Sequence, residues 1–262
     1  MADDDCLDLS LDDGILTVRL NRPGTRNAQD PALWRALAAL GADLPAGTRA
    51  VVLAGAGPSF SAGLDRRMLT PEGIPGEGSM VALAGLAPGE LDARIARFQD
   101  AFRWWRRCPV VTVAAVGGHA VGAGFQLALA CDVMVVADDV ALSMREPQLG
   151  LVPDLGGTLP LVESVGYSRA LELVVSGRWV GAEEAVRIGL ALRSVPRERL
   201  DAEALAVARS CAQAPASAIS ATKQLLRDAL HERGHTAAHE ARLAAERAAQ
   251  GERIRQLAAR VP

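Results

Sequence analysis

A stretch without charged side chains runs from Pro109 to Cys131 and contains two kinds of apolar pattern. It begins with the β-branched run Val110–Val113 and ends in the apolar segment Phe125–Ala130. Four glycines separate the two patterns: Gly117, Gly118, Gly122 and Gly124. This order predicts a buried strand, a glycine-rich turn and a buried helix. Glycines at such a junction let the backbone approach a ligand, and the first N–H groups of the helix stay unpaired, so an oxyanion would fit there.

Three other structures fit parts of this pattern. A transmembrane helix needs about 20 apolar residues, but glycines and polar side chains interrupt this run. The spacing of Gly118, Gly122 and Gly124 also occurs in dinucleotide-binding turns. However, the sole tyrosine, Tyr167, has no lysine four residues later, and the only lysine is Lys223; this argues against a short-chain dehydrogenase and excludes a Walker-type phosphate loop. A buried strand and helix whose glycines serve packing alone remains an alternative.

Hydrophobic periodicity elsewhere predicts alternating strands and helices. Leu7–Ser10 and Ile15–Leu20 flank Asp13-Gly14, and an Asp-Gly pair between such runs is a strong hairpin signal. Asp30-Pro31 has the residues of a helix start, and Ala50–Ala54 is an apolar run that ends in a turn of small residues. Recurring strand, glycine turn and helix indicate an α/β protein whose site lies outside the carboxyl ends of the strands.

The segment from residue 66 to residue 90 is rich in glycine and proline and shows little periodicity. We expect a long loop there that either borders a pocket or is partly mobile. Leu91–Arg107 reads as a helix, and residues Leu91–Trp105 are expected to line that pocket together with the loop. Two short strands are expected where the sequence reads DVMVVA and ALSM.

Beyond residue 157 the pattern is almost entirely helical, with Leu192–Val195 as one edge strand. The last three segments are Ala/Arg/Leu-rich amphipathic helices, expected at Glu198–Gln213, Ala216–His231 and Ala237–Ala259. Apolar stripes of this kind suit an interface. We therefore divide the chain into a core, residues 1–197, and a C-terminal helical region, residues 198–262, that serves oligomerisation.

Composition narrows the possible functions. Half of the 262 residues are apolar, but aromatic residues make up only 3%, so stacking platforms for nucleic-acid bases are scarce. The net charge of −3 comes without a basic cluster, and neither nucleic acid nor a membrane is expected as a partner. The four cysteines are too scattered for a metal or redox pair: Cys6, Cys108, Cys131 and Cys211. Reduced thiols and an N-terminus without signal-peptide features favour a cytoplasmic protein.

Six segments, in this order, resemble the crotonase family of enoyl-CoA hydratases and isomerases over residues 7–262: LNRPGTRNA, FSAGLD, GGHAVGAGFQLALACD, EPQLGLVPDLGGT, SGRWVGAEEAVRIGL and APASAISATKQLL. The resemblance implies a crotonase-like superhelix of repeated β-β-α units with a C-terminal helical layer. It also implies a homotrimer or hexamer. The expected substrate is an acyl-CoA thioester, with no separate cofactor.

By this resemblance, the backbone N–H groups of Leu64 and Ala123 form an oxyanion hole for a thioester enolate. Both residues follow apolar strands in glycine-rich turns, which agrees with the interpretation from the residues alone. Each such donor contributes roughly 3–4 kcal/mol to transition-state stabilisation. The resemblance also places the substrate along five further residues: Arg26, Ala28, Ala62, Asp65 and Gly122.

Hydratases of this family hold one water between two glutamates, and the resemblance places Glu146 at one of these positions and Gln126 at the other. A glutamine orients water but exchanges no proton, and positioned acid–base groups contribute about 10²–10⁴-fold to the rate. Pro147 is expected to keep Glu146 out of helical geometry. The alternative for Glu146 is an ordinary surface carboxylate.

Asp154 falls where the dienoyl-CoA isomerases and aromatic-acyl-CoA dehalogenases of the family have a functional aspartate. Its alternative role is to cap a helix that begins near Gly156. His119, beside the oxyanion turn, is expected to be packed rather than to act as a base. These residues together predict an enzyme of the enoyl-CoA hydratase/isomerase type, favouring an isomerase or a weak hydratase because of Gln126. A catalytically weak or inactive acyl-CoA-binding pseudoenzyme is the alternative.

Overall fold

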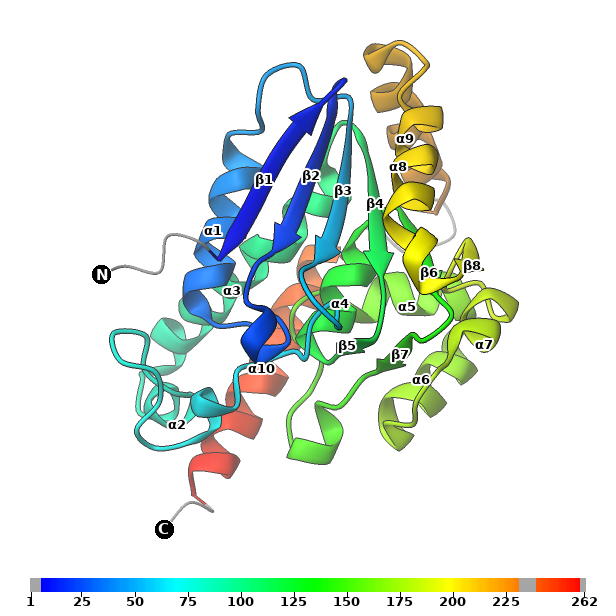
Figure 1. The fold of residues 1–262 in the computed structure, drawn as a ribbon. Helices are drawn as coiled ribbons and strands as arrows, with labels where there is room; N and C mark the ends of the chain where they lie inside the picture. The colour runs from blue at the N-terminus through cyan, green and yellow to red at the C-terminus, as the bar shows by residue number, and fades with distance from the viewer. Residues whose placement is uncertain (1–5, 231–238, 260–262) are drawn as a thin grey trace.

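The computed structural model describes residues 6–230 and 239–259. Within these residues, a six-stranded sheet forms the centre of the molecule (Figure 1). The first strand is antiparallel to its neighbour, and the other pairs are parallel. The strands in sheet order are β1 (Leu7–Asp12), β2 (Ile15–Leu20), β3 (Ala50–Gly55), β4 (Val111–Val116), β6 (Val133–Ala137) and β8 (Arg193–Val195).

Helices cover both faces of this sheet, which explains the nearly continuous apolar runs of the parallel strands. In β3, Val51 and Leu53 face α1 (Pro31–Ala42), α3 (Pro88–Arg107) and α4 (Ala123–Ala130). Ala50 and Val52 face the opposite way and pack against α8 (Leu200–Cys211). Figure 1 shows α8 in front of the sheet, with α1 and α3 behind it. The α/β class predicted from the sequence is confirmed.

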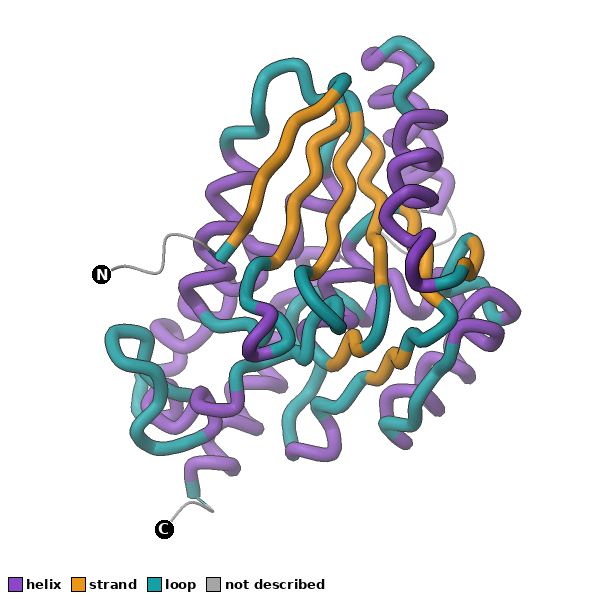
Figure 2. Tube along the Cα trace, in the orientation of Figure 1, coloured by secondary structure: helices purple, strands orange, loops and turns teal. Residues whose placement is uncertain are grey.

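A second, two-stranded sheet lies below the main one and consists of β5 (His119–Val121) and β7 (Ala141–Ser143) (Figure 2). Ser61 pairs with Ala120 on one side of it, and Val180 pairs with Leu142 on the other. The sequence predicted an uninterrupted glycine-rich turn where β5 lies. This prediction was incomplete. Residues His119–Val121 form a strand only because they pair with β7 and with Ser61, which lie in distant parts of the chain.

Local signals at the N-terminal end are confirmed. Asp13 and Gly14 adopt positive φ angles of 46° and 75°, as a tight hairpin between β1 and β2 requires. Asp30 is the N-cap of α1 and accepts a 2.9 Å hydrogen bond from the N–H of Leu33, with Pro31 at the first helical position. These features depend on neighbouring residues, so a sequence pattern identifies them.

The prediction of a long loop from residue 66 to residue 90 was wrong in part. This segment contains η2 (Arg66–Leu69) and α2 (Met80–Ala84), and α3 begins before its end. Asp65 caps η2, and the hydroxyl of Ser79 caps α2 by accepting from the N–H of Ala82 at 3.0 Å. The helices are too short to show periodicity, so their caps were the only signal in the sequence.

The second half of the chain is mostly helical, as predicted, and the edge strand at Leu192–Val195 is confirmed by β8. The helices are α5 (Thr158–Val165), α6 (Tyr167–Ser176), α7 (Ala182–Arg187), α9 (Ala216–Leu230) and α10 (His239–Ala258), and the remaining short turns are η1 (Pro23–Thr25), η3 (Pro147–Leu149) and η4 (Arg197–Arg199). The expected helix ends at His231 and at residues 237–238 lie outside the described residues. No helix in the described part of the chain combines the length and apolarity needed to span a bilayer.

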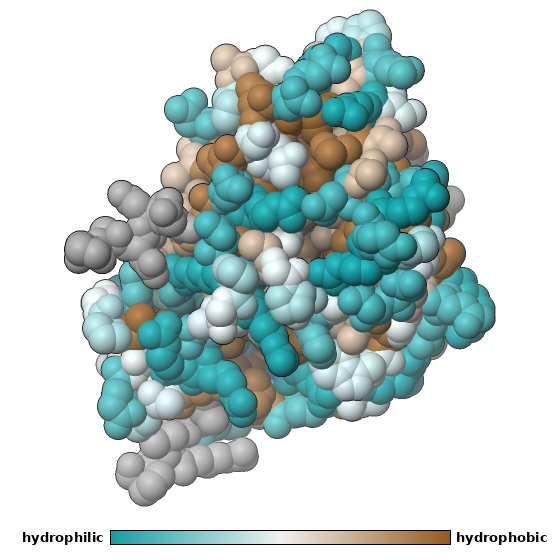
Figure 3. All heavy atoms as spheres, viewed as in Figure 1, coloured by the Kyte–Doolittle hydropathy of each residue, from teal (hydrophilic) through white to brown (hydrophobic). Residues whose placement is uncertain are grey.

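The C-terminal region packs in two places. Leu200, Ala204 and Ala208 of α8 form a core with the sheet, whereas α10 packs on α2 and α3 at the opposite end of the molecule. The surface in Figure 3 is largely hydrophilic, with an apolar area above the strands at the top of the view. The division at residue 197 and the role of residues 198–262 in oligomerisation stay predictions.

Candidate active site

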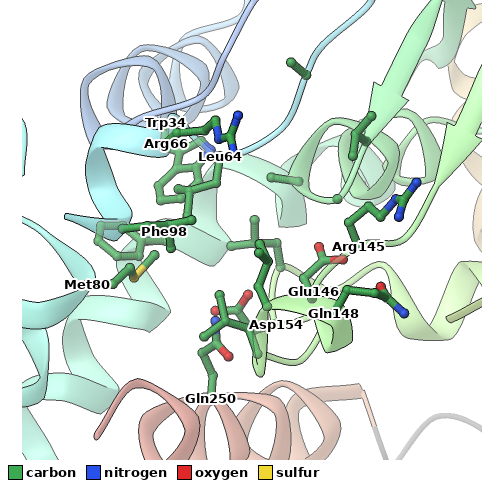
Figure 4. Close-up of a pocket in the computed structure, with 18 residues that line it drawn as sticks. Trp34, Leu64, Arg66, Met80, Phe98, Arg145, Glu146, Gln148, Asp154 and Gln250 are labelled. Atoms are coloured by element: carbon green, nitrogen blue, oxygen red, sulfur yellow. The ribbon is translucent and has the colours of Figure 1, made fainter. Parts of the chain in front are cut away.

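A cavity of about 370 Å³ lies where the second sheet, η3 and α10 meet. Leu64 and Ala123 line it beside the second sheet, and Glu146 and Asp154 form a polar wall. Figure 4 shows these two carboxyl side chains near the centre of the view, with the apolar side chains of Trp34, Met80 and Phe98 to one side. The cavity therefore combines an apolar compartment with two acidic groups, which suits a ligand that is partly hydrocarbon.

Backbone pairing brings the two glycine-rich turns together. The N–H of Ser61 donates to the carbonyl of His119 at 2.9 Å, and the N–H of Val121 donates back to Ser61 at 3.0 Å. Gly63 has φ +81°, and a Cβ there would lie 2.3 Å from the carbonyl oxygen of Val121 and 3.5 Å from the nitrogen of Ala123. The two turns approach this closely because residue 63 has no side chain.

Leu64 follows Gly63, and Ala123 is the first residue of α4. Within the described residues, neither N–H donates a backbone hydrogen bond. Both residues line the cavity. Two unpaired N–H groups on adjacent turns, one of them at a helix N-terminus, can stabilise negative charge on an oxygen placed between them.

Gly122 lines the cavity, and its lack of a side chain leaves room for Glu146. Its φ is +51°, and a Cβ at this position would lie 3.2 Å from Oε1 of Glu146. The backbone at residue 122 therefore lies directly beside this carboxyl group. A side chain at residue 122 would be strained and would crowd the acid.

Glu146 lies at the start of η3, and its side chain is only 8% exposed. The alternative of a surface carboxylate is therefore wrong. The expectation that Pro147 keeps Glu146 out of helical geometry is also wrong, because its angles are φ −57° and ψ −47°. The carbonyl of Glu146 accepts the N–H groups of Leu149 and Leu151, each at 3.0 Å. These two bonds offset the steric preference that a following proline imposes.

The carboxyl group of Glu146 is short of hydrogen-bond donors. Nε2 of Gln126 donates to Oε1 at 2.7 Å, and within the described residues Oε2 is buried without a partner. Burial disfavours the ionised form and raises the pKa of Glu146 to about 7. A carboxyl group with this pKa can both take and return a proton near neutral pH.

Gln126 is 1% exposed and lies behind the cavity wall. Its Oε1 accepts the N–H groups of Leu155 at 3.0 Å and of Gly157 at 3.2 Å. Because both backbone groups are donors, the amide oxygen of Gln126 must face them. The amide nitrogen of Gln126 therefore faces Glu146. Gly157 makes this possible, because a Cβ there would lie 2.6 Å from Cγ of Gln126. The glutamine thus fixes Glu146 against the loop that contains Asp154.

Asp154 lines the cavity and is 7% exposed. The alternative that it caps a helix is wrong, because α5 begins at Thr158, its N-cap is Gly157, and no side chain caps it. Burial raises the pKa of Asp154 well above its usual range, and the charges of Glu146 and Glu246 raise it further. Asp154 therefore favours its protonated form beside the carboxyl group of Glu146.

Of the other residues expected along the substrate, Ala62 lines the cavity. Its N–H donates to the carbonyl of Arg26 at 2.8 Å, and Arg26 itself is exposed. Ala28 is buried beside this turn. Asp65 accepts from Arg67 at 2.8 Å, and hydrogen bonds from Arg67 lower the pKa of Asp65. The contact of these four residues with coenzyme A stays a prediction: Arg26, Ala28, Ala62 and Asp65.

The sequence correctly predicted that residues 66–90 and α3 would contribute to the pocket, since Met80 and Phe98 line it. It missed Trp34 of α1, whose ring centroid lies 4.8 Å from that of Phe98. It also missed Gln250 of α10. A tryptophan among the leucines of α1 is only a weak sequence signal that Trp34 lines a pocket. No residue near Gln250 in the sequence indicates that it does so.

His119 is half-buried and lies outside the cavity lining. Its ring makes an edge contact with Trp179, with the centroids 5.6 Å apart. This environment agrees with a packed side chain. Among the residues that the structure describes, no group of three or more His, Cys, Asp or Glu side chains could hold a metal ion.

Comparison with known proteins shows the family of this chain. A family model described as enoyl-CoA hydratase/isomerase matches residues 10–257. Human mitochondrial Δ(3,5)-Δ(2,4)-dienoyl-CoA isomerase is 34% identical over 86% of this chain and 68% of its own. A probable enoyl-CoA hydratase of Mycobacterium bovis is 32% identical over 80% of this chain and 76% of its own.

A crystal structure from Thermobifida fusca, of a provisionally assigned enoyl-CoA hydratase in complex with acetoacetyl-CoA, has the same fold. It is 43% identical, with a TM-score of 0.82 over 96% of this chain and 95% of the other. A second structure described in the same terms contains coenzyme A. With its fold, paired turns and nearly full-length family match, this chain belongs to the enoyl-CoA hydratase/isomerase, or crotonase, family.

Proposed function

We propose that this protein is a double-bond isomerase of acyl-CoA thioesters, and that its preferred substrate is a 3,5-dienoyl-CoA, converted to the 2,4-dienoyl-CoA. The observation that carries this proposal is the second buried acid, Asp154, which faces the same cavity as Glu146. Moving two conjugated double bonds requires proton removal next to the thioester and proton addition at the far end of the diene. Two separate acid–base groups suit that task.

The first step is proton abstraction by ionised Glu146 from the carbon next to the thioester carbonyl. The electrons of the broken C–H bond move toward the carbonyl, which becomes the oxygen of an extended enolate (a trienolate) conjugated with both original double bonds. The N–H groups of Leu64 and Ala123 would stabilise this oxyanion, each by roughly 3–4 kcal/mol. A pKa of about 7 for Glu146 supports a base that is ionised in a large fraction of molecules at neutral pH.

In the second step, protonated Asp154 donates its proton to the carbon of the trienolate that is farthest from the thioester. The electrons return from the oxygen and form the 2,4-diene. Glu146 now holds the proton that it removed and Asp154 is ionised, so one proton transfer restores the starting state. No separate cofactor takes part, because coenzyme A belongs to the substrate.

Hydration of a 2-enoyl-CoA is less well supported. A hydratase of the two-glutamate type needs a base and an acid on one water, whereas the amide of Gln126 is held by two backbone N–H groups and Glu146. The amide exchanges no proton and does not line the cavity. We therefore expect hydration to be slower than isomerisation.

A substrate panel tests this proposal. Purified protein would be given 3,5-dienoyl-CoA, 3-enoyl-CoA and 2-enoyl-CoA of matched chain lengths, with products followed by ultraviolet absorbance and mass. We expect kcat/KM for dienoyl isomerisation to exceed that for hydration by at least about tenfold. Faster hydration than isomerisation would contradict the proposal. Tight calorimetric binding of a non-reactive acyl-CoA without turnover of any of the three would identify an acyl-CoA-binding pseudoenzyme instead.

A further inference from the structure

The loop that contains Asp154 is held at both ends by two side chains of α10. Oε1 of Gln250 accepts the N–H of Val152 at 3.1 Å, two residues before Asp154. Oε2 of Glu246 accepts the N–H of Gly156 at 3.0 Å, two residues after it. Glu246 and Gln250 are four residues apart and so lie on one face of the helix. The helix bonds to the loop on both sides of the acid.

Further contacts fix this arrangement. The hydroxyl of Thr158 donates to Oε1 of Glu246, so both carboxylate oxygens of Glu246 hold the loop and the start of α5. Figure 4 shows Gln250 rising from α10 toward Asp154 and the cavity that both residues line. The two backbone bonds connect residues that are 98 and 90 positions apart in the sequence. The backbone on both sides of Asp154 is therefore bonded to α10.

Gln99 of α3 holds the same loop at its centre. Its Nε2 donates to the carbonyl of Asp154 at 2.6 Å and to the carbonyl of Leu243 in α10 at 3.4 Å. Nη1 of Arg247 donates to Oε1 of Gln99 at 2.9 Å. A buried amide with its hydrogen bonds satisfied favours one arrangement of its neighbours, because breaking any bond leaves a buried polar group unpaired.

The charges around Asp154 come from several elements. Glu146 approaches from η3 and Glu246 from α10, and each raises the pKa of the Asp154 carboxyl. Arg66 and Arg145 line the same cavity. Arg247 lies behind Gln99, where it pairs with Asp92 at 2.8 Å. The negative charge from α10 thus acts directly on the protonation of Asp154.

We propose that Glu246 and Gln250 are positioning residues for the reaction, and that α10 is a working part of the active site that aims Asp154 at the far end of the substrate's diene. This inference rests on the proposed function. It assigns to α10 a role within its own chain, in addition to the oligomerisation predicted for residues 198–262.

The first test compares the rates of two variants with a 3-enoyl-CoA and with a 3,5-dienoyl-CoA. Glu246→Gln removes the charge and one of the two acceptors, and Gln250→Ala removes the acceptor for Val152. Isomerisation of a 3-enoyl-CoA needs Glu146 alone, whereas that of a 3,5-dienoyl-CoA also needs Asp154. We expect each variant to lower kcat for the dienoyl substrate about tenfold, with KM changed less than about threefold. The rate with the 3-enoyl substrate should stay within about threefold of wild type.

Matched controls lie on the same helix. Glu252→Gln and Gln256→Ala change residues that bond to each other on the outer side of α10, and both should leave the two activities unchanged. Thermal unfolding of every variant would show whether the fold is intact. If Glu246→Gln did not fold, Gln250→Ala would carry the same kinetic test without a change in charge.

A second readout does not depend on turnover. Protein labelled with ¹³C at the aspartate carboxyl carbons can be titrated by NMR, with Asp154→Asn used to assign the resonance. We expect Asp154 to titrate at lower pH in Glu246→Gln and at the wild-type pH in Glu252→Gln. A folded Glu246→Gln variant with unchanged titration and unchanged dienoyl kcat would overturn the inference. A shifted titration in a protein without dienoyl activity would retain the role of α10 and reject the proposed function.

Discussion

The amide of Gln126 connects the two acids that face the cavity. It donates to Glu146 at 2.7 Å and accepts from the backbone just after Asp154. A glutamate at residue 126 would place two carboxyl groups within hydrogen-bond distance, and one of them would have to retain a proton. The glutamine instead donates to Glu146, which favours its ionised form. Gln126 thus supports a single base rather than a pair of acids on one water.

Removing either acid should separate their roles. We expect Glu146→Gln to lower kcat for isomerisation of both 3-enoyl-CoA and 3,5-dienoyl-CoA by about 10²–10⁴-fold, since it removes the base. Asp154→Asn should lower only the dienoyl rate to a similar extent. Steady-state kinetics with both substrates measures this difference. A loss of less than about tenfold in every activity of Glu146→Gln would show that Glu146 is not the base.

The pH dependence of the rate follows from the two raised pKa values. Glu146 must be ionised to act as a base, so kcat/KM should rise as pH increases through about 7. Asp154 must be protonated to act as an acid, so kcat/KM should fall as pH passes its raised pKa. A kcat/KM profile for the dienoyl substrate should therefore be bell-shaped. A profile that stays flat around neutral pH would contradict this assignment.

The same raised pKa of Glu146 also affects stability. Between its ordinary value of 4.5 and its folded value of about 7, the folded state binds more protons at this site than the unfolded state. The free energy of unfolding should therefore fall as pH rises through this interval, by an amount on the order of 3 kcal/mol. Glu146→Gln should flatten this part of the curve, as urea unfolding at several pH values would show.

At the scale of elements, the junction between β5 and α4 determines the geometry of the site. Gly122 lies at this junction with φ +51°, beside Oε1 of Glu146. Gly122→Ala should cost about 1–3 kcal/mol in stability because of the positive φ. It should also lower kcat at least tenfold, since small displacements of reacting groups are expensive. The variant would be compared with wild type by kinetics and by urea unfolding.

Gly181→Ala is the matched control for this substitution. Gly181 is the N-cap of α7, with φ −86°, and a Cβ there would meet no atom within 4 Å. We expect kcat to stay close to wild type and the free energy of unfolding to fall by less than about 1 kcal/mol, because alanine is a poorer N-cap residue than glycine. If Gly122→Ala behaved like this control, the backbone at residue 122 would not position Glu146.

At the scale of the whole molecule, apolar surface remains uncovered. Tyr167, Leu171 and Val175 recur every four residues on α6 and are 68%, 47% and 62% exposed. An apolar stripe of this kind on a helix suits contact with another protein surface. We expect a homotrimer or hexamer, so light scattering at micromolar concentration should give three or six times the chain mass of 27.4 kDa. A monomer would contradict this prediction.

The sequence alone determined what depends on near neighbours or on a whole-chain pattern. The Asp13-Gly14 hairpin and the Asp30 cap follow from a few adjacent residues. The apolar strands and glycine-rich turns identified the α/β class and pointed to the two turns, and the resemblance to the crotonase family assigned the donors to the N–H groups of Leu64 and Ala123. Such backbone donors can be predicted from sequence because a glycine-rich turn or a helix start leaves N–H groups unpaired without the help of a distant side chain.

The tertiary structure decided what depends on contacts between distant segments. Whether Asp154 capped a helix or faced a cavity was left open by its neighbours in sequence, and the structure placed it in the cavity wall. The orientation of Gln126 and the contacts of Glu246 depend on partners between 20 and 90 residues away. Such side-chain bonds form only after the backbone has folded, so no local pattern encodes them. The oxyanion turns and the candidate acids are therefore visible in the sequence, whereas the contacts that set the acids in the cavity wall and join one of them to α10 are decided only by the fold.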